Sequence, residues 1–141
     1  MTVNVPRIPI LQIENFLVAS IQTELHDKTA LQFKDDLLQR IYDTKARGLV
    51  LDLTAIDVVD SFIARIIGDL AEMADLMGAT VVVTGLQPAV AITLVELGVE
   101  MHQVATALNL EKGIMVLRQL VANNGLDRVL PGAWDNKSDV V

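Results

Sequence analysis

The centre of the chain is an apolar run followed by a short polar loop and an amphipathic stretch. Residues 49–53 are apolar except for Asp52, a pattern typical of a strand that is buried on both faces of a sheet. From Ser61 onward, apolar residues recur at the spacing that lines one face of a helix. They are Phe62, Ile63, Ile66, Ile67, Leu70, Met73, Ala74 and Met77. The pattern predicts a strand, a loop over residues 54–60 and a helix that Asp60 caps through its carboxylate.

Before this centre, the pattern predicts a hairpin and a helix. Arg7 to Ile13 and Phe16 to Gln22 are β-prone runs, and the polar pair between them is suited to a turn. Thr29 and Gln32 have the spacing of a capping box, in which each side chain bonds the backbone amide of the other residue. The apolar side of the helix is predicted to consist of Leu31, Phe33, Leu37, Leu38, Ile41 and Tyr42. Gly48 is expected to close this segment.

After the centre, the pattern predicts a second buried strand and a helix. Thr80 to Thr84 is a β-branched run, which favours a strand. The next four residues, Gly-Leu-Gln-Pro at 85–88, predict a turn. Pro88 is suited to the first position of a helix, which we expect to run to about Leu97.

The last part of the chain predicts a short strand, a helix and a tail. Met101 to Ala105 is the predicted strand, and Asn109 can cap the final helix. The apolar face of that helix is expected to carry Leu110, Ile114, Leu117, Leu120 and Val121. The sequence Asn-Asn-Gly at 123–125 is expected to end it. We therefore predict a single domain over residues 1–124 and a C-terminal tail over 125–141.

Composition narrows the classes of protein to which the chain can belong. It has 141 residues, the length of one domain, and contains no cysteine, which excludes disulfides and thiolate metal sites. The net charge of −7 argues against a nucleic-acid partner, because binding to phosphates needs clustered Lys and Arg. Residues 76–95 carry no charge, but glycines and a proline divide them, so no membrane span is predicted. No signal peptide is visible, and a cytoplasmic location is expected.

Motifs of catalysis are missing from the sequence. There is neither the G-x-x-x-x-G-K-[ST] nor the G-x-G-x-x-G pattern that cradles phosphates, and His26 and His102 are too isolated to suggest a metal pair. We therefore expect a protein that is not an enzyme and that uses no metal or cofactor. Ser61 stands out, because a hydroxyl at a helix start lies near free amides that favour an added phosphate. Spacing alone leaves open that Ser61 merely shares in capping the helix.

Three segments together resemble the STAS domain, the fold of the anti-sigma-factor antagonists. They are GLVLDLTAIDVVDS at 48–61, GATVVVTGLQP at 78–88 and ELGVE at 96–100. The resemblance covers about Pro6 to Leu120 and implies an α/β fold, with a mixed sheet of four to five strands flanked by about four helices. Asp60-Ser61 matches the phosphorylation motif of the family. The Gly-Leu-Gln-Pro turn is similar to that of the branch found in stressosomes.

The resemblance also implies a function and partners. A single-domain scaffold of this branch, with no sensory domain ahead of it, sequesters a switch protein-serine kinase and releases it when the serine matching Ser61 is phosphorylated. It joins a homo-oligomer or large assembly with STAS paralogues that carry sensory N-terminal domains, and a serine phosphatase resets the site. Thr93 matches a second modified position in related proteins, although a plain core or surface role suits it better. The residues expected to contact the partner are Asp57, Asp60, Gly85, Gln87 and Pro88.

Two other functions fit parts of the sequence. A response-regulator receiver domain would accept phosphate on Asp52, which follows a buried strand, but the chain opens with a hairpin and has no acidic pair after its first strand. A small enzyme or ligand carrier would use the loop over residues 49–61 as the edge of a pocket. A bound molecule would be needed to favour this last function.

Overall fold

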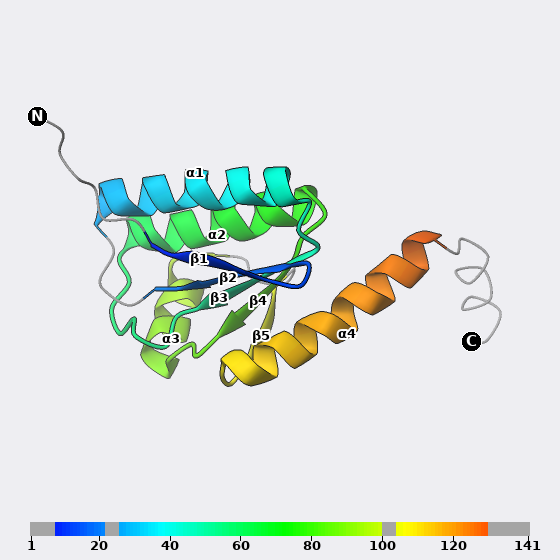
Figure 1. Cartoon of the computed structure of the whole chain (residues 1–141). Coiled ribbons are helices and arrows are strands. Elements are labelled where there is room, and N and C mark those ends of the chain that lie inside the picture. The colour runs from blue at the N-terminus through cyan, green and yellow to red at the C-terminus, as the bar shows by residue number, and fades with distance from the viewer. Residues whose placement is uncertain (1–7, 22–25, 100–103, 130–141) are drawn as a thin grey trace, which may run out of the picture.

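The structure, a computed structural model, describes residues 8–21, 26–99 and 104–129, with the backbone alone over 124–129. In these ranges the elements are β1 Ile10–Ile13, β2 Phe16–Ser20, α1 Asp27–Thr44, β3 Gly48–Asp52, α2 Ser61–Leu76, β4 Thr80–Thr84, α3 Pro88–Glu96, β5 Ala105–Ala107 and α4 Leu110–Val129 (Figure 1). The strands form one sheet in the order β1-β2-β3-β4-β5. β1 and β2 are antiparallel, and the later neighbours are parallel. This mixed five-stranded sheet with four helices is the α/β fold that the resemblance implied.

Helices cover both faces of the sheet. α1 and α2 lie side by side over one face, and α4 crosses the other (Figure 1). Because side chains alternate along a strand, Leu49 and Leu51 of β3 face the α1–α2 layer, and Val50 faces α4. The two cores together explain the unbroken apolar run of β3.

Two glycines let α4 lie close against the sheet. A Cβ atom on Gly48 would stand 2.6 Å from Cδ1 of Leu117, and a Cβ atom on Gly113 of α4 would collide with Cγ2 of Thr84. Gly48 is the first residue of β3, and it is the point at which α4 contacts this strand closely. Its predicted role in closing the preceding helix is wrong.

The start and the face of α1 also differ from the prediction. The helix begins at Asp27, and its N-cap residue His26 makes no side-chain capping bond. The capping box of Thr29 and Gln32 is therefore wrong, and Nε2 of Gln32 instead donates to Asp36 of the next turn at 2.8 Å. The predicted apolar stripe is correct for the buried residues Phe33, Leu37 and Ile41, whereas Leu31 and Tyr42 are exposed. The helix ends at Thr44, before Lys45 in the left-handed conformation with φ 56°.

The central helix begins as predicted. Oδ1 of Asp60 accepts a hydrogen bond from the backbone N of Ile63 at 2.9 Å, so Asp60 is the N-cap of α2. Two residues of the predicted apolar face, Met73 and Met77, are exposed. Two alanines are buried that the prediction omitted, Ala64 and Ala71. Ala64 belongs to the core cluster that also contains the buried residues of α1.

The C-terminal part confirms one prediction and corrects another. Oδ1 of Asn109 accepts from the backbone N of Lys112 at 2.9 Å and so caps α4, as expected. The helix does not stop at 123–125 but continues to Val129. The last strand is β5 at 105–107, and most of the predicted strand over 101–105 lies outside the described residues. Within the described ranges, no helix is both long and apolar enough to cross a membrane.

Candidate functional site

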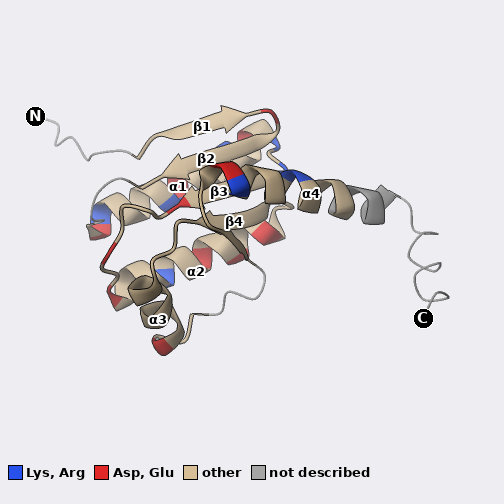
Figure 2. Ribbon diagram, turned by 90° about the horizontal axis from the view of Figure 1, so that it is seen from below, with Lys and Arg blue, Asp and Glu red and all other residues tan. Residues whose placement is uncertain are grey.

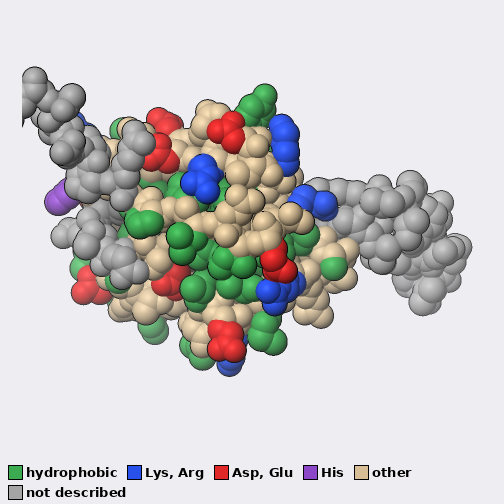
Figure 3. Space-filling view, in the orientation of Figure 1, with side chains coloured by type: hydrophobic (Ala, Val, Ile, Leu, Met, Phe, Trp, Pro, Cys, Tyr) green, Lys and Arg blue, Asp and Glu red, His purple; other side chains and the backbone are tan. Residues whose placement is uncertain are grey.

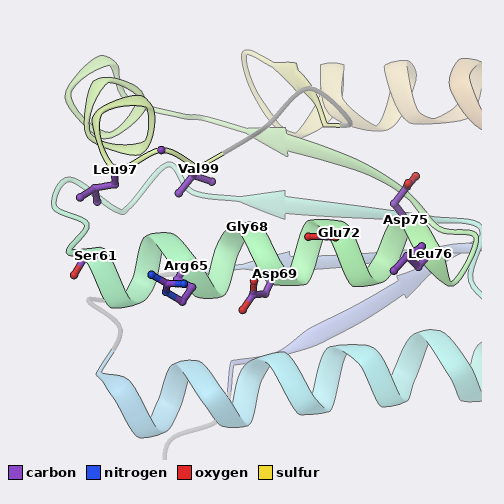
Figure 4. Close-up of a pocket in the computed structure, with 10 residues that line it drawn as sticks. Ser61, Arg65, Gly68, Asp69, Glu72, Asp75, Leu76, Leu97 and Val99 are labelled. Atoms are coloured by element: carbon purple, nitrogen blue, oxygen red, sulfur yellow. The ribbon is translucent and has the colours of Figure 1, made fainter.

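The candidate site lies where the parallel strands β2, β3 and β4 end. Carboxyl ends of parallel strands meet at one edge of a sheet, so the loops that follow them come together. The loop over residues 53–60 leads from β3 into α2, and the turn over 85–87 leads from β4 into α3. Ser61, the first residue of α2, stands at this edge (Figure 4).

Ser61 is exposed, and among the described residues its hydroxyl forms no hydrogen bond. The capping bond at this helix start comes from Asp60, whose backbone O also accepts from the backbone N of Ala64 at 2.9 Å. The hydroxyl is therefore not needed to cap the helix. It is accessible to a modifying partner.

The loop before Ser61 has apolar residues buried in the core and acidic residues exposed to solvent. Ile56 and Val59 are buried in the core, and the backbone N of Ile56 donates to the O of Leu53 at 3.0 Å. Asp57 and Asp60 are exposed. Alternation of buried and exposed residues thus holds two carboxylates at the surface of the loop that precedes Ser61.

Asp52 lies inside a cluster of hydroxyl groups. Its Oδ1 accepts from Oγ1 of Thr54 at 2.8 Å and from Oγ1 of Thr84 at 2.7 Å, and its Oδ2 accepts from Oγ of Ser20 at 3.3 Å. The strand register places Ser20, Asp52 and Thr84 side by side at the ends of β2, β3 and β4. Both carboxylate oxygens are therefore committed to hydroxyl donors. This geometry does not favour Asp52 as a phosphate acceptor of the receiver type.

The Gly-Leu-Gln-Pro turn packs on the loop. Nε2 of Gln87 donates to the backbone O of Thr54 at 2.9 Å. Gly85 has φ +69°, and a Cβ atom there would stand 2.9 Å from the Cα of Thr54. A side chain at position 85 would thus be strained and would collide with the loop. Pro88 is exposed at the first position of α3, as predicted.

A shallow groove of about 550 Å³ runs along α2 from Ser61 (Figure 4). The outer side of α2 forms one wall, and the segment after α3 forms the other. Gly68 permits this approach, because a Cβ atom there would stand 3.1 Å from Cγ1 of Val99. The lining residues are Ser61, Arg65, Gly68, Asp69, Glu72, Asp75, Leu76, Leu97, Gly98 and Val99. The wall formed by α2 carries three carboxylates and one arginine, and Figure 2 shows acidic residues along this helix.

The remaining predicted residues lie apart from this arrangement. Oγ1 of Thr93 donates to the backbone O of Ala89 at 2.9 Å, one turn earlier in α3. His26 precedes α1, and His102 lies outside the described residues. In the described ranges, no group of His, Cys, Asp or Glu side chains could hold a metal ion.

Sequence reasoning missed two features of the site. Arg65 lies one helical turn after Ser61 and lines the same groove, and the spacing of four residues could have indicated it. The hydroxyl donors Thr54 and Thr84 were missed because their partnership with Asp52 depends on strand register. The only hint was a threonine at the end of β4 and another two residues after the end of β3.

Comparison with known proteins agrees with this geometry. The model of the STAS domain family matches residues 7–112. A Moorella thermoacetica RsbS variant with a serine replaced by glutamate is 42% identical and has a TM-score of 0.76, covering 82% of this chain and 97% of that one. A chain from a structure of the stressosome, described as a signal integration and transduction hub, is 45% identical with a TM-score of 0.73, covering 79% and 97%.

Curated relatives are longer proteins. The RsbT co-antagonist protein RsbRA of Bacillus subtilis is 30% identical over 115 residues, which are 82% of this chain and 41% of that protein. RsbRB of the same organism is 30% identical over 98 residues, which are 70% of this chain and 34% of that protein. The chain thus spans between a third and about two fifths of these relatives. Since the family model covers most of the chain, the chain belongs to the STAS domain family, with RsbS and RsbR proteins of the stressosome among its relatives.

Proposed function

We propose that the chain is a stressosome scaffold that sequesters a switch protein-serine kinase and releases it when Ser61 is phosphorylated. The observation that carries this proposal is the Ser61 hydroxyl, which is exposed at the start of α2 and forms no hydrogen bond among the described residues. The similarity to RsbS over nearly the whole of that chain supports the scaffold role. RsbRA is named as a co-antagonist of RsbT, and we infer a partner of that kind here.

Phosphorylation would change the charge of this surface without melting the helix. A phosphoserine adds about −1.5 to −2 charges, which the free amides and dipole of a helix start stabilise. Arg65, one turn later, offers a cation on the same side of α2, and in the described structure it has no ion-pair partner. The helix therefore tolerates the phosphate.

A bound partner would not tolerate the same change. The phosphate joins the exposed carboxylates of Asp57 and Asp60, and like charges brought together across an interface can cost several kcal/mol. A loss of about 1.4 kcal/mol already lowers affinity tenfold. The repulsion between the added phosphate and a partner bound to this surface is therefore large enough to release the kinase.

The other partners follow from the scaffold role. We infer assembly with further copies or with STAS paralogues that carry sensory domains, in the cytoplasm, and a serine phosphatase that resets Ser61. Figure 3 shows hydrophobic side chains gathered beside α4, on the face of the sheet that this helix covers only in part. Such a surface suits assembly. Pro88 and the two exposed carboxylates, Asp57 and Asp60, are the residues that we expect the kinase to contact directly.

The test is phosphorylation by a protein-serine kinase from the same gene neighbourhood, read by intact mass. Ser61→Ala is expected to abolish the added phosphate while the fold is retained. Thr93→Ala is the matched control, because its hydroxyl already donates to Ala89 and we expect it to be the weaker candidate for modification. Undiminished phosphate on the Ser61→Ala protein would overturn the proposal.

A further inference from the structure

The turn after β4 and the loop before α2 are far apart in sequence but lie in contact. Gln87 and Thr54 are separated by 33 residues, and the Nε2 of Gln87 donates to the backbone O of Thr54 at 2.9 Å. Gly85 presses on the same residue, since a Cβ atom at position 85 would stand 2.9 Å from the Cα of Thr54. The turn therefore touches the start of the loop with both a hydrogen bond and a close backbone contact.

These contacts act on the part of the loop that faces solvent. Thr54 and Ala55 are exposed, whereas Ile56 and Val59 anchor the middle of the loop in the core. An exposed loop start without a side-chain clamp would exchange among several backbone conformations. The side chain of Thr54 is held by its bond to Asp52, and Gln87 adds a clamp on the backbone O of Thr54 from outside the loop.

We propose that Gln87 and Gly85 are positioning residues for the modification of Ser61, because together they hold the loop over residues 53–60 in the shape that a kinase recognises. This inference rests on the proposed function and deepens it. It gives Gln87 a role within the chain, in place of the direct contact with the partner that the sequence suggested. A kinase that docks on a folded surface binds more tightly when the loop is already ordered, since it need not supply the ordering free energy itself.

Gln87→Glu tests the clamp with little change in shape. The carboxylate has no hydrogen to donate and places an oxygen against the carbonyl of Thr54. Gln39→Glu on α1 is the matched control, because Nε2 of Gln39 also donates one bond at 2.9 Å, to Asp43, and the charge change is the same. Gly85→Ala is a second variant, which should push the turn from the loop through its φ of +69°.

Two readouts separate positioning from a general loss of structure. The first is amide hydrogen exchange at Ile56, whose backbone N donates to the O of Leu53 within the loop. Loss of a bond of ordinary strength should speed this exchange about fivefold in Gln87→Glu. Exchange at Thr80, which bonds the backbone O of Arg47 at the opposite edge of the sheet, should not change. The second readout is kcat/KM for phosphorylation of Ser61, which should fall by about the same factor.

Each outcome decides the inference. Faster exchange confined to the loop together with slower phosphorylation supports it, provided that Gln39→Glu behaves as the wild type. Slower phosphorylation without faster exchange would mean that Gln87 contacts the kinase directly, and faster exchange without slower phosphorylation would mean that the clamp does not matter for the reaction. Either result overturns the inference. If the wild type accepts no phosphate, the proposed function fails, and unchanged exchange would then also refute the clamp.

Discussion

Replacement of Asp52 measures how much the hydroxyl cluster contributes to the fold. In Asp52→Ala, three hydroxyl groups lose the carboxylate that accepts from them, at 2.7, 2.8 and 3.3 Å. Thr84 is fully buried, so its hydroxyl would have no access to water. At about 1 kcal/mol for each net hydrogen bond, the expected loss in free energy of unfolding is about 3 kcal/mol.

Asp52→Asn should cost much less, because the amide keeps one oxygen that can accept from Thr54 and Thr84. The amide nitrogen would face Ser20, whose oxygen can accept in turn. Loss of the charge should still weaken these bonds, by about 1 kcal/mol in total. A ranking of alanine well below asparagine is therefore the expected result.

Urea unfolding of the three proteins provides the measurement. With a typical slope, about 3 kcal/mol lowers the midpoint by about 1 to 3 M urea. Asp43→Ala is the control, because that exposed carboxylate accepts a single bond from Gln39 and should change stability by no more than about 0.5 kcal/mol. An Asp52→Ala protein as stable as the control would refute the cluster as a structural unit. Asp52→Asn should also keep the phosphate on Ser61, whereas a receiver domain would lose it.

Three further predictions concern the core, the switch and assembly. Gly48→Ala should destabilise the fold by about 1 to 3 kcal/mol in urea unfolding, because its Cβ would stand 2.6 to 2.8 Å from the buried Leu117; an unchanged midpoint would contradict the close contact of α4. Ser61→Asp should weaken binding of the kinase in calorimetry, and the loss should be larger at low salt than at high salt. Ser61→Ala should bind the kinase permanently. Equal affinity of both variants and of the phosphorylated protein would exclude Ser61 as the release switch. Light scattering should give a mass above the 15.4 kDa of one chain, alone or with paralogues, and a monomer under every condition would exclude assembly.

Local chemistry made the centre of the fold predictable. Asp60 as N-cap and Pro88 as a first helical residue were correct, because capping and proline geometry depend on neighbours in sequence. The local capping pattern of Thr29 and Gln32 was wrong, however, because the helix begins earlier, at Asp27. Another error arose where a distant part of the chain decides a residue's role. Gly48 was taken as a helix stop, and its real constraint is Leu117 of α4, which no local pattern reveals.

The local features of the candidate site were predictable, and its contacts between distant segments were not. The helix start at Ser61 follows from local pattern, and the structure has Ser61 as the first residue of α2 with Asp57 and Asp60 exposed in the loop before it. The contact between Gln87 and Thr54 depends on the parallel pairing of β3 with β4, which brings the segments after these strands to one edge. Parallel register joins residues about 30 positions apart, and a single sequence does not display it.

Thr84 contacts both α4 and the carboxylate of Asp52 with a single side chain. Its methyl group lies against Gly113 of α4, and its hydroxyl donates to Asp52 at the site edge. A threonine carries both groups on the same Cβ, so a turn about χ1 moves them together. One buried side chain therefore packs against α4 and also fixes the carboxylate of Asp52, at the edge of the sheet where the loop over residues 53–60 begins.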